Sequence, residues 1–376
     1  MKISFLSVFP PYRGGISKHS SLIYSHLSKK HDVQAINFNK LYPALFFPGK
    51  SQYDTKLDLI GDRLINSVNF FSWNKPIKSI QKYNPDTLLF KFWHPFFSPA
   101  YNFIIKKVKK KTNCDVIMIC DNIFPHEKFP FSKRLIKKLV KNVDGFIVQS
   151  SIVEKELNSL IDEPIYNKVF HPIYNNYPDL IDKSLAKRAL NIHESKVVLF
   201  FGFVRDYKGL DILIKSMRKV FEKESDIKLL IAGECYDEKD KYDKLINESD
   251  YKNKIIWVED FISDDDINIY FSAADVVVLP YRSASQSGVI PLSYHYNRPV
   301  ITSNLESLIE VVEDKKTGII FDLKKEDSLE SAILDFFKNY KLVSYYENID
   351  NYKRNFSWGN FISAIEDISE RLNERK

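Results

Sequence analysis

The chain is poor in cysteine. Its 376 residues contain three, Cys114, Cys120 and Cys235. Their number is odd, no two are spaced as a Cys-x-x-Cys pair, and no cluster of histidines accompanies them. These absences argue against a disulfide framework and against a structural zinc site, because both need matched sets of ligands. Unpaired thiols fit a reducing compartment, so we expect a cytoplasmic protein.

Long apolar runs are also missing. No stretch reaches the roughly 18 apolar residues of a membrane-crossing helix, and the apolar start, Ile3 to Val8, is too short and too early for a signal peptide. The 11 glycines and 16 prolines are too scattered for a low-complexity segment, and we find no internal repeat. The sequence therefore predicts an ordinary globular protein that would meet a membrane only from the side.

A large charge excess is absent as well. Basic residues number 55 and acidic residues 49, which gives a net charge of +6. So small an excess favours a local basic patch over general binding of nucleic acid. We expect no nucleic-acid partner.

What the sequence does contain predicts an α/β protein of two domains. At about 100 to 200 residues per domain, the chain is long enough for two full cores. Two blocks of apolar strands alternate with helices over residues 1–172 and 173–354, with a polar linker near 172–190 and a final helix within 355–376. Such alternation predicts two doubly wound, Rossmann-like sheets with ligands at the carboxyl ends of their strands.

The most informative stretch follows the predicted strand Asp275–Leu279. A loop of small polar residues leads into a helix that has Pro291 in its first turn, where proline is tolerated. Free backbone N–H groups at such a junction suit a phosphate or diphosphate, although an ordinary strand-to-helix turn would look similar. The candidate binding residues here are Ser285, Gln286, Ser287, Gly288 and Val289.

Basic residues follow the first strand of the second block. Arg205 and Lys208 come after the predicted strand Lys196–Gly202 and could neutralise a diphosphate, although lone basic residues in loops are often merely solvated. Downstream, Ser263 is predicted to cap a helix that carries Asp264 and Asp265. This acidic run lacks the alternating ligands and glycine of a calcium loop, so we predict no metal site there.

Two loops of the first block also contain candidate ligand-binding residues. Gly14 and Gly15 lie in the loop after the first strand, where they permit close approach of the backbone, or else make a simple tight turn. His126 follows the strand Asp115–Cys120 and could hold a sugar hydroxyl, or merely cap its loop. Farther on, Ser151 is predicted to cap a helix.

The segment Phe129–Lys141 predicts an amphipathic helix with one strongly basic face. Its apolar positions, among them Leu135 and Leu139, fall opposite that face. Either the helix packs on the core with solvated lysines, or its basic face attracts anionic lipid. The basic residues are Lys133, Arg134, Lys137, Lys138 and Lys141, with Lys106, Lys107, Lys109, Lys110 and Lys111 nearby in sequence.

A family resemblance connects these features. The stretch IYFSAADVVVLPYRSASQSGVIPLSYHYNRPVITSN, residues 269–304, resembles the nucleotide-sugar-binding segment of family 4 glycosyltransferases, and the likeness continues through Glu310–Gly318. It extends to the Gly14–Gly15 loop and to Asn122–Glu127. The resemblance implies the GT-B fold, in which two Rossmann-like domains face each other across a cleft and a C-terminal helix crosses back to the first domain.

The resemblance also implies roles for residues of the second domain. Lys208, with Arg205, would bind the diphosphate of the donor. The turn at Gly233 and Glu234 would lie beside the nucleotide, whose base would meet the backbone near Val258. The residues from Ser285 to Val289 would support phosphate or sugar.

In the first domain, the same resemblance implies that His126 faces the transferred sugar. Gly14 and Gly15 would contact the donor diphosphate or the acceptor. One departure concerns two glutamates of the usual family pattern, whose places fall on Ala284 and Leu292 in this chain. The sequence resembles instead a branch that carries Ser-Gln-Ser-Gly-Val.

The predicted function is a retaining, metal-independent glycosyltransferase that uses a nucleotide sugar as co-substrate and needs no cofactor. The acceptor would be a glycan or a lipid-linked saccharide, in bacterial surface polysaccharide assembly. Two alternatives stay open: a nucleotide-sugar epimerase or phosphorylase of the GT-B fold, and a non-catalytic sugar-binding subunit.

Overall fold

The chain forms two compact units. A computed structural model describes residues 1–43, 51–54, 56–125, 129–174, 176–340 and 343–375. The first unit consists of Met1–His171 together with Trp358–Lys376, and the second of Pro172–Ser357. The sequence-based boundaries lay after residues 172 and 354.

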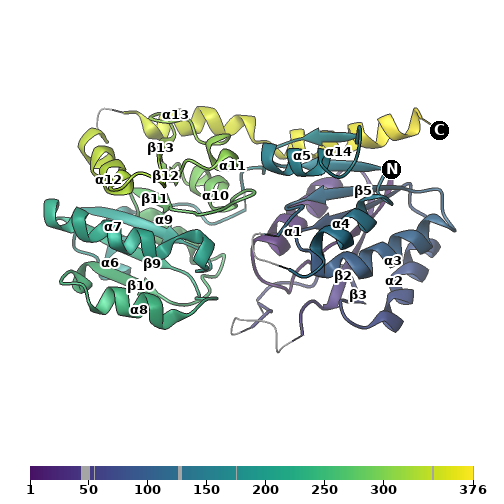
Figure 1. Ribbon diagram of the computed structural model, residues 1–376, viewed down its shortest axis with the longest axis horizontal. Coiled ribbons are helices and arrows are strands. Elements are labelled where there is room, and N and C mark those ends of the chain that lie inside the picture. Colours follow the sequence, from purple (N-terminus) through teal and green to yellow (C-terminus); the bar gives the residue numbers. More distant parts are fainter. Residues whose placement is uncertain (44–50, 55, 126–128, 175, 341–342, 376) are drawn as a thin grey trace. The chain divides into compact units, whose positions relative to one another are not determined.

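The first unit contains a seven-stranded sheet in the order β3-β2-β1-β4-β5-β6-β7, and all its pairings are parallel (Figure 1). Strands β1, β4, β5 and β6 are short, mostly apolar runs that are buried on both faces, as is usual in parallel sheets, whereas the edge strands β3 and β7 are more polar and more exposed. The strands of this sheet are β1 (Lys2–Leu6), β2 (Asp32–Lys40), β3 (Asp62–Asn66), β4 (Thr87–Phe92), β5 (Asp115–Cys120), β6 (Gly145–Val148) and β7 (Tyr166–Lys168).

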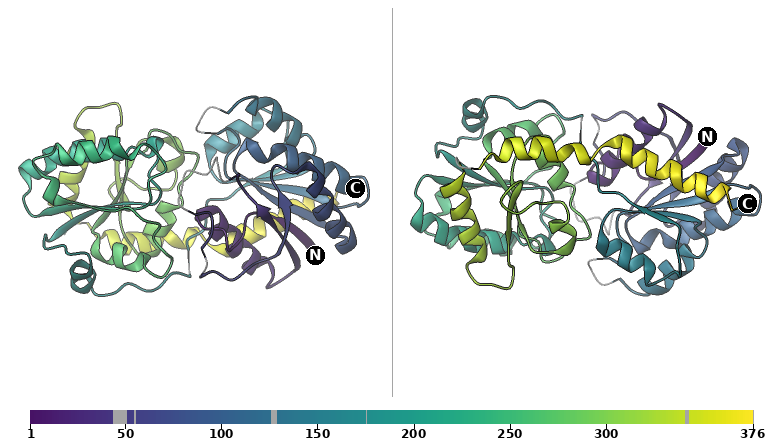
Figure 2. Two further views of the ribbon diagram at one scale, coloured as in Figure 1. Left: turned by 90° about the horizontal axis from the view of Figure 1, so that it is seen from below. Right: turned by 90° about the horizontal axis from the view of Figure 1, so that it is seen from above.

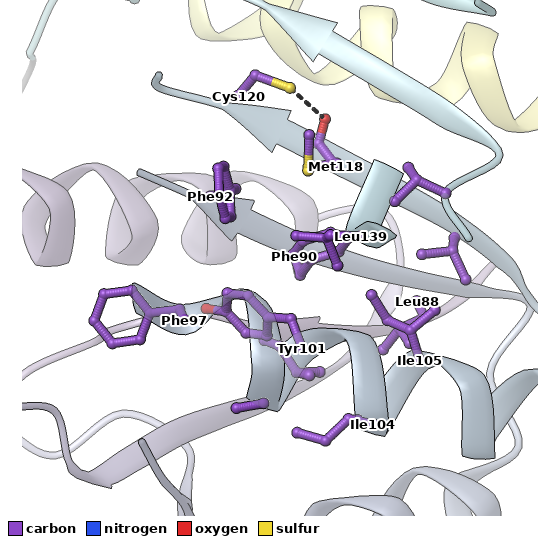
Figure 3. Close-up of a cluster of buried hydrophobic side chains, with 14 of the residues drawn as sticks. Leu88, Phe90, Phe92, Phe97, Tyr101, Ile104, Ile105, Met118, Cys120 and Leu139 are labelled. Carbon is purple, nitrogen blue, oxygen red and sulfur yellow. Dashed lines mark hydrogen bonds between the residues drawn. The ribbon is translucent and has the colours of Figure 1, made fainter. Parts of the chain in front are cut away.

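Side chains of each strand alternate between the two faces of this sheet. Leu88, Phe90 and Phe92 of β4 belong to a core that includes Tyr101 and Leu139 of the covering helices (Figure 3). The helices of this unit are α1 (Gly15–Leu27), α2 (Asn74–Tyr83), α3 (Ser98–Lys109), α4 (Ser132–Val140), α5 (Ser151–Asn158) and α14 (Trp358–Asn373), with the short 3-10 helices η2 (Phe70–Trp73) and η3 (Pro95–Phe97).

The C-terminal helix α14 completes the first unit. It contacts β5, β6, β7 and α1, and it lies along the strands in Figure 2. Gly145 makes this close packing feasible, because a Cβ at that position would lie 2.3 Å from Ile368 Cγ2. Residues from the two ends of the chain therefore share one core.

The second unit contains a six-stranded sheet in the order β10-β9-β8-β11-β12-β13, again with parallel pairings. Its strands are β8 (Lys196–Phe201), β9 (Ile227–Ala232), β10 (Ile255–Val258), β11 (Val276–Leu279), β12 (Val300–Ser303) and β13 (Gly318–Phe321). Its helices are α6 (Lys183–Ala189), α7 (Leu210–Lys223), α8 (Lys239–Asn247), α9 (Ile267–Ala273), α10 (Val289–His295), α11 (Glu306–Ile309), α12 (Ser328–Asn339) and α13 (Tyr345–Tyr352), with η4 (Asp206–Lys208), η5 (Lys252–Lys254) and η6 (Lys353–Asn355).

Three local predictions were wrong. The linker expected over 172–190 contains helix α6, which packs against α9 and is capped by the Asp182 carboxylate. The cap of α5 is Ser150, whose Oγ accepts the Val153 N–H at 3.4 Å, and not Ser151. Ser263 does not cap α9, which begins at Ile267, because its hydroxyl donates to the Asp266 carboxylate at 2.6 Å. At these two helices, the prediction misplaced the cap position by one and by three residues.

Within the described part of the chain, no helix combines the length and the apolar character that crossing a bilayer requires.

Candidate functional site

The loops after β8 and β11 meet at the topological switch point of the second sheet. Strand β8 lies between β9 and β11, and the chain reaches β11 only after it has completed β9 and β10 on the other side. Ligands of open α/β sheets bind at such a point, beyond the carboxyl ends of the strands. The site is therefore expected between residues 202–209 and 280–289.

Arg282, which the sequence analysis did not select, ties the two loops together. Its backbone N–H donates to Tyr207 O at 2.7 Å. Its guanidinium donates to Asp206 O at 2.7 Å and, through both terminal nitrogens, to the Asp211 carboxylate at 2.9 and 2.6 Å. Burial raises the pKa of Asp211, but the bonds to Arg282 outweigh it, so the pKa of this carboxyl is lowered overall. A bidentate pair of this kind fixes geometry as well as charge.

A glycine allows the same two loops to touch. Gly209 has φ 69°, and a Cβ there would lie 2.0 Å from the carbonyl oxygen of Pro280. No other residue fits such a contact without a shift of the backbone. The Lys-Gly pair at 208–209 is thus explained by packing as well as by chemistry.

Lys208 presents a cation near the ends of β8 and β11. Its Nζ lies 5.9 Å from the centroid of the Tyr281 ring and 3.4 Å from the position that a Cβ on Gly202 would take. Burial, and then the nearby charge of Arg205, lower the pKa of the Lys208 ammonium to about 7. Among the described residues, no carboxylate forms an ion pair with it. The site therefore holds a cation that lacks an anionic partner.

Two serines, from the end of β12 and from α11, donate hydrogen bonds to backbone carbonyls of the loop before α10. Ser303 Oγ donates to Tyr281 O at 2.8 Å, and Ser307 Oγ donates to Ala284 O at 2.7 Å. At the start of α10 the Val289 N–H donates to Ser287 Oγ at 3.2 Å. These hydrogen bonds fix the backbone of the loop at Tyr281, Ala284 and Val289.

The predicted loop residues differ in exposure. Ser285 is buried, Gln286, Ser287 and Val289 are half-buried, and Gly288 is exposed. Ala284 and Leu292, at the two glutamate places of the family pattern, are buried apolar residues. Neither position 284 nor position 292 therefore carries a carboxylate that could contact a ligand.

The turns after β9 and β10 continue the same edge of the sheet. The Gly233 N–H donates to Val258 O at 3.0 Å, and the Val204 N–H donates to Glu234 O at 2.9 Å. Gly233 and Glu234 are therefore neighbours of the β8 loop, and Val258 lies next to Gly233 on the far side from that loop.

Sequence reasoning missed an aromatic group on this edge. Phe203 stacks on Tyr236 with ring centroids 4.3 Å apart and lies 6.0 Å from the Phe261 ring. The Arg205 guanidinium lies 5.6 Å from the Tyr236 ring. The signal was available, since each aromatic residue follows the end of a neighbouring strand by two to four positions.

Two of the predicted residues of the first unit, Gly14 and Gly15, lie between the end of β1 and the start of α1. Gly14 precedes α1 with φ 102°, and Gly15 is the first residue of that helix. His126 lies outside the described residues. The segment before it is anchored, because the buried Asp121 carboxylate pairs with Lys91 Nζ at 3.0 Å and accepts from Gln149 Nε2 at 2.8 Å.

Comparison with known proteins finds one family model that matches most of the second unit. Residues 182–356 match the family described as Glycosyl transferases group 1. The chain is 26% identical over 272 residues to the Bacillus subtilis protein YtcC, covering 68% of this chain and 66% of that protein. It is 25% identical over 248 residues to a D-inositol 3-phosphate glycosyltransferase of Corynebacterium aurimucosum, covering 62% and 58%. Each match spans less than two thirds of the relative's own length.

Solved structures share the fold over the whole chain. Sucrose-phosphate synthase of Thermosynechococcus elongatus superposes with a TM-score of 0.76 at 16% identity, and covers 100% of both chains. HepE of Anabaena in complex with UDP-glucose has a TM-score of 0.77 at 15% identity, also with full coverage of both. Identities this low establish the fold alone, which is GT-B with two Rossmann-like domains.

Proposed function

We propose that this chain, whose residues 182–356 match the family Glycosyl transferases group 1, is a retaining glycosyltransferase that takes its sugar from a nucleotide-sugar donor. The observation that carries the proposal is Lys208, a half-buried lysine that forms no ion pair with a carboxylate among the described residues. It lies beside Tyr281, in the loop that leads to Ser285–Val289. A donor diphosphate supplies the anion that this place lacks.

The main requirement of the proposed reaction is stabilisation of the negative charge that develops on the leaving diphosphate. As the bond between sugar and diphosphate breaks, the departing phosphate oxygen becomes more negative, and a preorganised cation in a site of low dielectric stabilises it. Binding of the diphosphate in turn favours the protonated form of Lys208, whose pKa in the free protein is about 7. Arg205 is proposed to share this role, and the amides from Ser285 to Val289 to support phosphate or sugar.

The finer features rest on the family resemblance. We propose attack by the acceptor hydroxyl on the same face of the sugar, with His126 at the reacting face and Gly14 and Gly15 against donor or acceptor. Gly233, Glu234 and the backbone at Val258 would line the nucleotide. No metal or other cofactor takes part in the proposed reaction.

The proposed acceptor is a saccharide, free or lipid-linked, in the assembly of bacterial surface polysaccharide on the cytoplasmic side of the membrane. We also propose peripheral contact with that membrane. The comparisons lend no support to the epimerase alternative.

The test is incubation of the purified protein with a panel of UDP-, GDP- and ADP-sugars, with and without saccharide acceptors. Sugar-dependent release of nucleotide that requires an acceptor, with the anomeric configuration kept in the product, is the expected result. Formation of an epimer without acceptor would support the epimerase instead. Binding without any turnover would indicate a sugar-binding subunit.

A further inference from the structure

Three neighbouring helices of the first unit carry basic residues and no acidic ones. Helix α2 has three lysines, α3 has three, and α4 has three with one arginine, whereas none of the three helices contains Asp or Glu. All of these basic side chains are exposed. They are Lys75, Lys78, Lys82, Lys106, Lys107, Lys109, Lys133, Arg134, Lys137 and Lys138, and we call this surface the basic face.

The three helices lie side by side, so the charges are spread over one surface (Figure 1). Gln81 of α2 donates from Nε2 to Lys107 O of α3 at 3.4 Å. Asn142, just after α4, donates from Nδ2 to Asn102 Oδ1 of α3 at 2.9 Å. Within the described part of the chain, Lys109 is the one member of the basic face that pairs with a carboxylate, that of Asp144 at 2.6 Å.

The charge is local and not a property of the whole chain, whose net charge is +6. Helix α14 of the same unit carries Glu366, Asp367 and Glu370 against a single arginine. Solvation alone does not demand such segregation, because mixed charges keep a surface equally soluble.

Exposed aromatic side chains accompany the basic face. Phe71 in η2 is 84% exposed and Phe131, just before α4, is 72% exposed, which are the highest values among the described large apolar residues. Phe70 is 49% exposed, and its ring lies 4.7 Å from that of Phe103 on α3. Lysines beside exposed phenylalanines are the composition of surfaces that lie in the interface of a bilayer.

We propose that the basic face, with Phe71 and Phe131, docks this protein on an anionic lipid membrane. Each basic residue near a charged leaflet contributes on the order of 1 kcal/mol, and aromatic rings add contact with the acyl boundary. Phosphodiester headgroups would meet the lysines, and the two phenylalanines would insert beside them. The proposal rests on charge and exposure, not on the proposed transfer reaction.

The test is co-sedimentation of the full chain with vesicles of phosphatidylcholine alone or mixed with phosphatidylglycerol. We expect binding only to the mixed vesicles, weakening as salt is raised. A variant with Lys133→Gln, Lys137→Gln and Lys138→Gln should bind about a hundredfold more weakly, from about 1 kcal/mol for each charge. Phe71→Ser should reduce the fraction that stays bound at high salt.

The matched control neutralises three exposed lysines of the second unit, with Lys215→Gln, Lys252→Gln and Lys324→Gln. It removes the same charge and should bind the mixed vesicles like the unaltered protein. Equal losses in both triple variants would overturn the proposal, as would absence of binding to the mixed vesicles. Tighter binding to RNA than to these vesicles at equal salt would also contradict it. Because no outcome involves sugar transfer, failure here is distinguishable from failure of the proposed enzyme activity.

Discussion

The protonation state of Lys208 should make the binding of a nucleotide sugar depend on pH. Its pKa of about 7 lies below the ordinary lysine value of 10.5, so the free protein loses this charge as the pH rises through 7. Affinity for a nucleotide sugar should therefore fall between pH 6 and 8.5, approaching tenfold per unit above pH 7. Titration calorimetry measures this. A nucleotide sugar is preferable to a free diphosphate, whose terminal phosphate itself titrates near pH 6.

The control for that profile is Lys208→Arg, which stays charged throughout this range and should show a nearly flat dependence. A profile that falls equally in the arginine variant would assign the titration to another group.

Replacement of Lys208 by methionine should separate catalysis from stability. Loss of the cation should lower kcat/KM about 100- to 1,000-fold, the usual effect of removing one preorganised donor. The fold should be retained, with an unchanged or raised melting temperature. Since the folded protein depresses this pKa, the lysine's contribution to stability grows as pH rises from 7 to 10.5, and at neutral pH its charge is a cost. Calorimetric melting and steady-state kinetics check both parts; a normal rate would remove Lys208 from the mechanism.

For single residues, the sequence predicted which residue types follow each strand, but not which other residues they contact in the fold. Lys208 could be selected because it stands at a strand end before a glycine. Arg282 could not, because its partner Asp211 lies 71 residues away and only the folded sheet brings them together. The depressed pKa of Lys208 likewise depends on burial, which no local pattern encodes.

The contact between the loop after β8 and the loop after β11 depends on Arg282. Arg282→Lys cannot reproduce the bidentate bond to Asp211 together with the bond to Asp206 O, so it should lower the free energy of unfolding of the second unit by about 2 kcal/mol. Urea titration followed by tryptophan fluorescence measures the change.

The comparison for that variant is Lys241→Met, which removes a more exposed ion pair with Asp206. Its effect should stay below about 1 kcal/mol. Equal effects of the two variants would show that Arg282 has no special role in joining the loops.

The packing of α14 on the first sheet predicts a coupled pair of substitutions. Gly145→Ala places a Cβ against Ile368 Cγ2 and should cost about 1 to 3 kcal/mol, while Ile368→Ala should cost about 2 to 5 kcal/mol through the cavity that it leaves. In the double variant the glycine substitution should add almost nothing further, because the obstructing methyl is gone. Strictly additive effects on unfolding would contradict this packing.

Elements with strong apolar runs were predictable almost to the residue. The strand predicted at Asp115–Cys120 has those bounds, and the final helix, expected within residues 355–376, spans Trp358–Asn373. Helix α6 was missed because its seven residues are largely polar and its place is set by packing against α9. Helix starts were missed where several capping residues stand in a row, as at Ser150 and Ser151.

For the whole molecule, the account predicts that activity needs no metal. Catalysis is assigned to Lys208, Arg205 and backbone amides, so dialysis against EDTA should leave kcat/KM unchanged within error. A metal that polarises the leaving phosphate contributes several kcal/mol, so its removal would lower the rate more than a hundredfold. Such a loss, restored by Mg²⁺ or Mn²⁺, would contradict the assignment.

At this scale the GT-B fold followed from the alternation of strands and helices together with the family resemblance, and solved structures confirm it. The basic face was predicted only in part. Periodicity identified α4, but the contribution of α2 and of the exposed Phe71 depends on how the helices cover the sheet, which the sequence does not reveal.

The most direct test of the central claim is a crystal structure of the protein with a nucleotide sugar bound. The account predicts a diphosphate oxygen within about 3 Å of Lys208 Nζ and close to the backbone amides from Ser285 to Val289. A diphosphate held elsewhere, with the Lys208 ammonium turned away from it, would contradict the account.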